Sequence, residues 1–268
     1  MKKKGNLFLY IGGAISGIMT ALIILGFFWT PYSPTALDSS AKFQPPSAAH
    51  IMGTDNFGRD IFSRVLDGAG DTFIIALCVV AIGCVFGVLI GSICGYIGGV
   101  PDLILTRVCD SITAFPSFLL ALVIVTILGK STANIVLALG ILFIPSFART
   151  VRGEFARCRE LNYIKSARLT GAGKFRIMFV HILPNTFSVL FTAVTIGFNN
   201  AVLSEASMSF LGIGIQPPFA SLGSMLSDSQ AYLHRAPWYA LCTGAVIILL
   251  ILGFSLLSEG LQRMNKGD

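Results

Sequence analysis

Six apolar runs constrain this chain more than any other feature of its sequence. They cover residues 7–29, 72–96, 110–128, 134–148, 186–212 and 237–257. About 20 apolar residues in a helix span the hydrocarbon core of a bilayer, where only helices and closed barrels satisfy every backbone hydrogen bond. The chain is 54% hydrophobic and only 12% charged. The sequence therefore predicts an all-α polytopic membrane protein with about six transmembrane helices.

The lysines and arginines are distributed unevenly between the two sides that six spans would define. One side, with both termini and a long basic loop at 149–185, holds fourteen of the 19 Lys and Arg residues. The other side holds only Lys42, Arg59, Arg64, Lys130 and Arg235. Because cytoplasmic loops are enriched in Lys and Arg, we expect both termini to be cytoplasmic. This placement explains the net charge of +6 without a nucleic-acid partner.

These runs divide the chain into four parts. Residues 1–30 form an N-terminal transmembrane helix, whose apolar stretch is too long for a cleaved signal peptide. Residues 31–70 form an external segment, and residues 71–258 form the main transmembrane domain, which contains the loop at 149–185. Residues 259–268 form a cytoplasmic tail.

The external segment contains four charged residues at helical spacing. Asp55, Arg59, Asp60 and Arg64 recur at intervals of four and five, so some are expected to pair along a short helix lying at the membrane surface. A solvated loop is the alternative. The specific run of residues 53–60 favours a shaped external element.

Glycine recurs every fourth residue in the second apolar run, at Gly83, Gly87, Gly91, Gly95 and Gly99. Residues four apart share one helix face, so the stripe lets another helix approach the backbone closely. We interpret the stripe as a helix contact, with a pore-lining role as the alternative. At the start of the third run, Arg107 and Asp110 are spaced to form an ion pair.

Two patterns suggest ligands that the chain is not expected to bind. Residues 129–132 (Gly-Lys-Ser-Thr) resemble the end of a phosphate-binding loop, but that motif needs a glycine where Ile124 stands. The histidines and methionines of the external segments are not brought together by anything in the sequence. We therefore predict no metal site, no cofactor and no nucleotide site, so energy for any activity must come from a gradient or from a partner.

The fifth apolar run contains a carboxylate, which is costly inside a membrane. A polar strip toward a bundle interior or a water-filled path is indicated by Asn199, Asn200, Ser204, Glu205, Ser207 and Ser209. The alternative is a structural Glu205 that is hydrogen-bonded to a neighbouring helix. Beyond the run, the repeated Gly and Pro of residues 210–218, including Gly212 and Gly214, predict a re-entrant or gate-like turn.

The loop at 149–185 reads RTVRGEFARCRELNYIKSARLTGAGKFRIMFVHILPN. Its bases, the small residues Gly171-Ala172-Gly173 and the closing Pro184 favour a basic, amphipathic helix-turn-helix that docks on a soluble partner. A merely solvated loop would explain the bases but not the small residues.

The same loop resembles the "EAA" loop of ABC-importer permease subunits, whose pattern is E-A-A-x3-G-x9-I-x-L-P. Ala167, Gly171, Leu183 and Pro184 match this pattern. Lys165 and Ser166 replace the Glu and the first Ala, and His181 replaces the Ile. An H-[IV]-L-P ending is usual in the peptide/nickel branch of that family.

Three other motifs are similar to that branch. They are residues 52–60 (L-G-T-D-x-x-G-R-D in the family), residues 114–116 (A-F-P) and residues 209–218 (S-F-L-G-L-G-x-Q-P-P). The chain thus resembles a "C" permease of a dipeptide, oligopeptide or nickel importer. The stretches 167–173, 208–212 and 228–232 are more similar to nickel permeases than to dipeptide permeases.

The resemblance implies a type I ABC-importer permease in the bacterial cytoplasmic membrane. It implies a heterodimer with a second homologous permease, two cytoplasmic ATPase subunits that bind ATP and Mg, and an external substrate-binding protein. It also implies a non-catalytic subunit whose ATPase-coupling loop comprises Lys165, Ser166, Ala167, Gly171, Ala172, Gly173, His181, Leu183 and Pro184. The translocation path or gate would involve Asn199, Asn200, Glu205, Ser209, Gly212 and Gly214, and the external element Asp55, Arg59 and Asp60. A gradient-driven secondary transporter or channel that uses Glu205 is the alternative.

Overall fold

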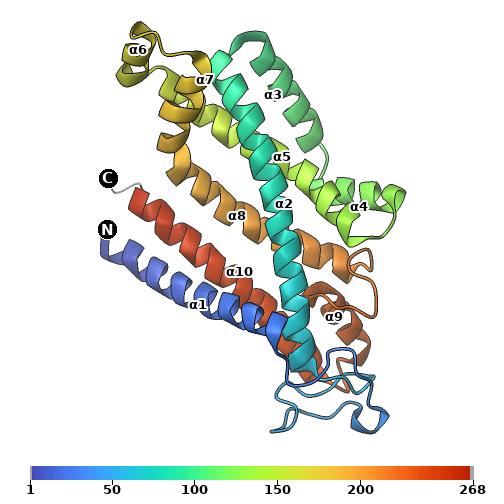
Figure 1. The fold of residues 1–268 in the computed structure, drawn as a ribbon. Helices are drawn as coiled ribbons and strands as arrows, with labels where there is room; N and C mark the ends of the chain where they lie inside the picture. The colour runs from blue at the N-terminus through green and yellow to red at the C-terminus, as the bar shows by residue number, and fades with distance from the viewer. Residues whose placement is uncertain (1, 266–268) are drawn as a thin grey trace.

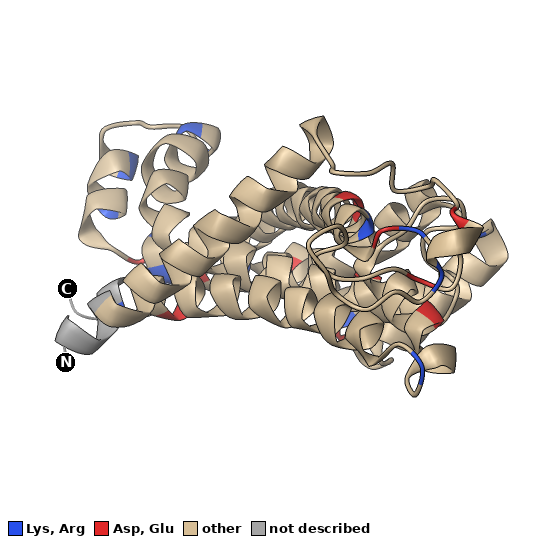
Figure 2. Cartoon of the chain, turned by 90° about the horizontal axis from the view of Figure 1, so that it is seen from below, with Lys and Arg blue, Asp and Glu red and all other residues tan. Residues whose placement is uncertain are grey.

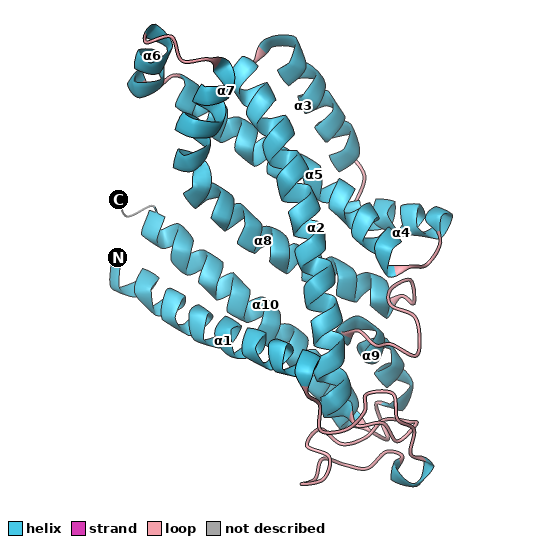
Figure 3. Ribbon diagram, in the orientation of Figure 1, coloured by secondary structure: helices cyan, strands magenta, loops and turns pink. Residues whose placement is uncertain are grey.

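The described chain, residues 2–265 of a computed structural model, is a bundle of helices joined by loops (Figures 1 and 3). The α-helices are α1 (Lys2–Phe28), α2 (Ile61–Ile97), α3 (Gly99–Thr113), α4 (Ser117–Leu128), α5 (Thr132–Arg159), α6 (Asn162–Leu169), α7 (Lys174–Arg176), α8 (Leu183–Phe210), α9 (Leu222–Ser229) and α10 (Pro237–Asn265). A π-helical turn, Ile177–Ile182, leads into α8, and 3-10 turns occupy Ser39–Ala41 and Gln230–Tyr232.

Among residues 2–265, five helices are long and apolar enough to cross a membrane, and the count reaches six if one bent helix pair forms a single span. The five are Leu7–Phe28, Ile61–Ile97, Thr132–Arg159, Lys174–Phe210 and Pro237–Arg263. The predicted third span is wrong in form: α3 and α4 meet at an angle of 82°. The break follows from Pro116, because proline lacks an N–H and disfavours helical geometry in the residue before it.

Two helices extend well beyond their predicted ends. The second begins at Ile61 rather than at residue 72, because the loop before it folds over its polar first turns and buries Arg64. The helix α5 runs through Pro145 to Arg159, so the first third of the predicted loop at 149–185 is a continuation of a membrane helix.

The glycine stripe of α2 packs against α5, as predicted. A Cβ atom on Gly83 would lie 2.9 Å from the Cβ of Phe143, and one on Gly95 would lie 2.9 Å from the Cα of Arg152. Gly87 and Gly91 also meet the backbone of α5, whereas Gly99 faces open space. Four of the five glycines therefore let the backbones of the two helices approach each other closely.

Ion pairs fasten α3 to α5. Asp102 of α3 pairs with Arg152, and Asp110 pairs with Arg149 at 3.2 Å. The predicted pair of Arg107 with Asp110 is therefore wrong. Because α3 lies alongside α5, a cation from the neighbouring helix reaches Asp110.

The first and last helices form an antiparallel pair. A Cβ atom added to Gly12 of α1 would run into the backbone of Leu257, and one added to Gly260 of α10 would lie 2.6 Å from the backbone nitrogen of Leu9. The start of α1 and the end of α10 therefore lie at one end of the bundle, which also carries α6 and α7 (Figures 1 and 2). We call this the α6 end. The opposite end, with residues 30–60 and α9, is the α9 end, where acidic and basic residues mix (Figure 2).

Candidate functional site

The turn after α6 is built on one glycine. Gly171 has a φ of +85°, in the region that other L-residues rarely adopt. The N–H of Gly171 donates to the carbonyl of Arg168, and the N–H of Ala172 donates to the carbonyl of Ala167, both at 3.0 Å. These two bonds are the Schellman motif that ends many helices. The Ala167-x3-Gly171 spacing is therefore the spacing of a helix stop, and it turns the chain back toward α8.

A small second core fixes α6 to the ends of the long helices. Ile164 of α6 is fully buried among Ile177 of the π-helical turn and Phe155 of α5. The guanidinium of Arg168 lies 5.2 Å from the ring centre of Tyr96, near the end of α2. Because close-packed side chains transmit displacement, a movement of α6 would carry α2, α5 and the start of α8 with it.

The free surface of this region is both apolar and basic. Leu169 and Phe175, on either side of the Gly171 turn, are 89% and 76% exposed. Lys165 and Arg168 are exposed on α6. Such a combination suits a protein partner that has an apolar groove with an acidic rim. The sequence reasoning did not single out Leu169 and Phe175, although two large apolar residues in a basic loop were the available signal.

The other predicted coupling residues lie around this surface. Lys165, Ser166, Gly173 and Pro184 are exposed, whereas Ala167, Ala172, His181 and Leu183 are half-buried. A Cβ atom on Gly173 would meet nothing within 4 Å, as would one on Gly171. The turn thus presents backbone that a partner can approach closely.

A groove of about 540 Å³ lies between α4, α5 and α8. Its polar lining residues are Ser117, Ser146, Thr150, Thr192, Asn200 and Ser204. The rest of the wall is apolar, so the groove offers hydrogen-bonding groups within a membrane-spanning surface. Asn200 and Ser204 were singled out from the sequence, but the other hydroxyl groups were not, because serine and threonine are common in membrane helices.

The carboxyl group of Glu205 lies outside this groove. The residue is fully buried, and the hydroxyl of Ser209 donates to its Oε1 at 2.6 Å. The hydroxyls of Thr72 in α2 and Ser221 before α9 lie beside it. Asn200 and Glu205 are five positions apart on α8, so their side chains point in directions that differ by about 140° around the helix axis. Glu205 and Asn200 therefore do not belong to one continuous polar strip, and Asn199 is half-buried outside the groove.

The segment after α8 repeats the turn chemistry of α6. Gly212 has a φ of +73°, its N–H donates to the carbonyl of Ser209, and the N–H of Ile213 donates to the carbonyl of Met208, both at 3.0 Å. Gly214 is buried against Ser209, where a side chain would not fit. The Gly-x-Gly pair therefore ends α8 and folds the chain back over it toward α9.

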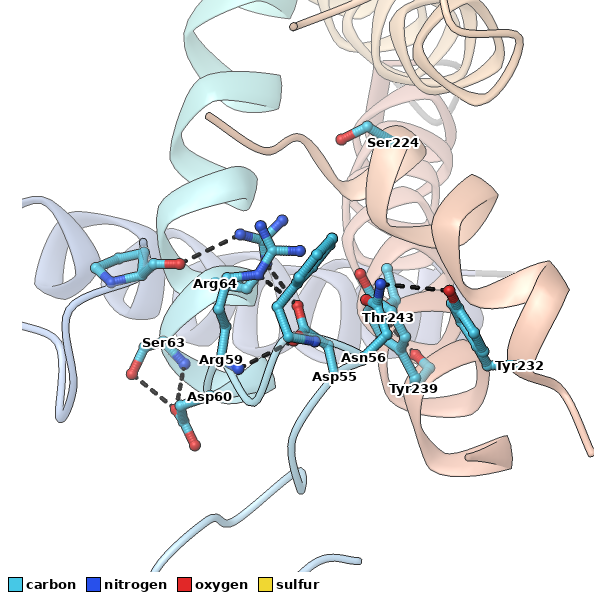
Figure 4. A network of polar contacts seen from close by, with 12 residues as sticks. Asp55, Asn56, Arg59, Asp60, Ser63, Arg64, Ser224, Tyr232, Tyr239 and Thr243 are labelled. Atoms are coloured by element: carbon cyan, nitrogen blue, oxygen red, sulfur yellow. Dashed lines mark hydrogen bonds and ion pairs between the residues drawn. The ribbon is translucent and has the colours of Figure 1, made fainter. Parts of the chain in front are cut away.

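At the α9 end, a buried ion cluster shapes the predicted external element (Figure 4). The carboxylate of Asp55 is fully buried and lies 2.6 Å from Nε of Arg59 and 3.7 Å from Nε of Arg64. It also accepts the N–H groups of Phe57 and Arg59, at 2.8 and 2.9 Å. The predicted pairing is confirmed, but the predicted short surface helix is wrong. A carboxylate that binds nearby backbone N–H groups favours a turn over a helix.

Further polar contacts tie this loop to its surroundings. Asp60 caps α2 by accepting the N–H of Ser63 at 2.8 Å, and its Oδ1 lies 2.9 Å from Nδ1 of His50. The amide of Asn56 donates to the hydroxyl of Tyr232 at 3.4 Å (Figure 4). The side chains of the motif residues Asp55, Arg59 and Asp60 thus stabilise the external element through hydrogen bonds and ion pairs inside it.

The Gly-Lys-Ser-Thr run at 129–132 forms a connection between helices. Gly129 ends α4, and the hydroxyl of Ser131 accepts the N–H of Asn134 at 3.2 Å to start α5. These residues therefore form two helix caps.

A bundle in which several of the described helices are long and apolar enough to cross a bilayer defines a multi-pass membrane protein. Residues 87–266 match the family described as the binding-protein-dependent transport system inner membrane component, and the chain belongs to this family. The resemblance seen in the sequence motifs is confirmed. The protein is an ABC-importer permease of the peptide family and spans the bacterial inner membrane several times.

Curated relatives match over nearly the full chain. The dipeptide transport system permease protein DppC of Haemophilus influenzae is 38% identical, over 93% of this chain and 88% of its own length. The glutathione transport system permease protein GsiD of Pectobacterium atrosepticum is 39% identical, over 92% and 84%. The di/tripeptide transport system permease protein DppC of Pseudomonas aeruginosa is 34% identical, over 98% and 90%.

Proposed function

We propose that this chain is one of two permease subunits of a peptide importer and that α6 is the coupling helix on which an ATPase subunit acts. The α6 end then lies in the cytoplasm, with both termini. The excess of Lys and Arg on that side supports this orientation. The partners are a second homologous permease, two ATPase subunits that bind ATP and Mg, and a substrate-binding protein at the α9 end.

The observation that carries the proposal is the exposed, basic and apolar surface around Gly171. Leu169 and Phe175 project from a short helix that is packed through Ile164 onto the long membrane helices. A partner that holds the two exposed side chains can therefore pull on the bundle through a rigid link. ATP-driven movement of the partner would rotate the membrane helices and alternate access to a central path.

The groove between α4, α5 and α8 is the part of the path that this chain contributes. Its hydroxyl groups and Asn200 can exchange hydrogen bonds with a peptide backbone, and the second permease would close its open side. Glu205 has a positioning role in this proposal, since its carboxyl group lies between α2, α8 and α9. Gly212 and Gly214 shape the turn that leads to α9.

The proposed substrate class is short peptides. Relatives that match over most of this chain are named for dipeptides, di/tripeptides and glutathione. The motif stretches that lean toward nickel permeases also build helix stops: Gly171 and Gly212 lie within them and end α6 and α8. They therefore carry little information about the cargo.

A docking experiment tests the coupling role. Leu169→Asp places a charge in the centre of the proposed contact, so purified complexes should lose the ATPase subunits and the ATP hydrolysis that loaded binding protein stimulates. Leu37→Asp is the matched control, because Leu37 is 69% exposed at the α9 end. Its complexes should keep their ATPases. Full ATPase retention and stimulation in Leu169→Asp would remove α6 from the interface.

A further inference from the structure

A cationic pocket of about 480 Å³ lies between the end of α2 and the turn after α6. Arg159, Arg168 and Lys174 line it, together with Tyr96 and Ile97. Its described lining contains no acidic side chain. The pocket lies at the α6 end, on the flank of the short helix.

The three cations differ in how they are neutralised. Arg159 pairs with Glu160 at 3.1 Å and donates to the carbonyl of Tyr96 at 3.3 Å. Within residues 2–265, neither Arg168 nor Lys174 forms an ion pair with a carboxylate. The guanidinium of Arg168 is held over the ring of Tyr96. Two cations without carboxylate partners at one cavity favour an anion between them.

An apolar track begins at the same pocket. Ile97, which lines the pocket, is 51% exposed, and Ile93, one turn earlier on the same face of α2, is 40% exposed. On α3, Val100 and Leu103 are 67% and 57% exposed. Ile93 and Ile97 lie at the end of a membrane-spanning helix, and Val100 and Leu103 lie at the start of the helix that follows it. A ligand with hydrocarbon chains can therefore contact these side chains while its charged group occupies the pocket.

We propose that this pocket binds the phosphate headgroup of an anionic phospholipid, whose acyl chains lie along Ile93 and Ile97. Basic pockets next to membrane helices on the cytoplasmic side commonly hold such headgroups. A free phosphate ion shares the headgroup chemistry but has nothing to place on the apolar track. Because α6 carries Arg168, the bound lipid ties the short helix to the membrane surface.

Lipid retention tests the proposal on the purified full chain. Phosphatidylglycerol or phosphatidylcholine is added to the delipidated protein, and bound lipid is counted by native mass spectrometry. The test variant is Arg168→Gln with Lys174→Gln, and the charge-matched control is Arg107→Gln with Arg176→Gln, outside the pocket lining. Each cation near an anionic surface contributes about fivefold in affinity, so the test variant should lose phosphatidylglycerol binding by about 30-fold. The control should bind like the wild-type chain.

Further measurements separate lipid from other occupants. Arg168→Lys keeps the charge and should keep the lipid, which distinguishes lost binding from lost folding. Glycerol 3-phosphate, the headgroup without chains, should not bind measurably. Equal binding of glycerol 3-phosphate and phosphatidylglycerol would assign the pocket to a free anion. Equal phosphatidylglycerol retention in the test and control variants would overturn the site. That conclusion would hold even if the test variant also lost ATPase subunits in the assembled complex, because such a loss would concern the docking surface and not the lipid pocket.

Discussion

The contact between α2 and α5 gives a quantitative prediction through Gly87. A Cβ atom there would lie 2.9 Å from the backbone nitrogen of Ala148 and 3.1 Å from the carbonyl carbon of Phe147. The Cβ of Phe147 would lie closer still. Favourable contacts between carbon atoms begin near about 3.5 Å, so the Gly87→Ala substitution pushes the two helices apart by roughly 1 Å. Backbone atoms cannot rotate away as a side-chain tip can. Overpacking of this kind costs about 1–3 kcal/mol.

A glycine in open space supplies the matched control. Gly17 of α1 has nothing within 4 Å of an added Cβ. Both Gly87→Ala and Gly17→Ala gain about 1 kcal/mol of helix propensity, so the difference between the two variants isolates the packing cost. Thermal unfolding of the purified chain in detergent measures this difference.

The expected difference follows from the packing cost. At about 2–4 °C per kcal/mol, Gly87→Ala should unfold several degrees below Gly17→Ala. Equal midpoints, or a higher midpoint for Gly87→Ala, would refute the argument that the glycine stripe exists for close helix contact.

Three further predictions concern other parts of the chain. Asp55→Asn removes the charge that compensates buried Arg64, so the free energy of unfolding should fall by about 3–5 kcal/mol. The control Asp38→Asn, at an exposed site, should change the free energy of unfolding by less than about 0.5 kcal/mol in the same thermal assay. Gly171→Asn should keep ATPase stimulation, because asparagine tolerates positive φ, whereas Gly171→Val should lose it at a conformational cost of about 1–2 kcal/mol; equal loss in both would point to contact rather than conformation. Glu205→Gln should leave peptide uptake unchanged, because neighbouring hydroxyls can bond an amide, and abolished uptake would assign the charge a role in transport.

The parts of the fold that could be predicted depend on local patterns. The stripe from Gly83 to Gly95 has the period of a helix face, so its use as a contact followed from spacing alone. The pairing of Asp55 with Arg59 also matched its four-residue spacing, although the two residues lie in a turn and not on a helix. The break at Pro116 could not be placed, because a proline near a helix start and a proline between two helices look alike in sequence.

The candidate site depends on rotations and distances that the sequence does not contain. Asn200 and Glu205 are neighbours in one apolar run, and only the packing of α8 decides which of them faces the groove. The family motif located the turn at Gly171, but its physical cause, a helix stop with φ of +85°, required the backbone. The cationic pocket joins Tyr96 to Arg168, two residues whose proximity no local pattern indicates.

Transport into proteoliposomes tests most directly whether partner ATPases drive this permease. The full complex is reconstituted with ATP and loaded binding protein on the appropriate sides, and dipeptide uptake is followed with and without ionophores that collapse all ion gradients. We expect uptake that requires ATP and every partner and that continues when the gradients are abolished. Uptake by this chain alone, driven by an ion gradient and stopped by the ionophores, would contradict the ATP-driven mechanism and support a secondary transporter.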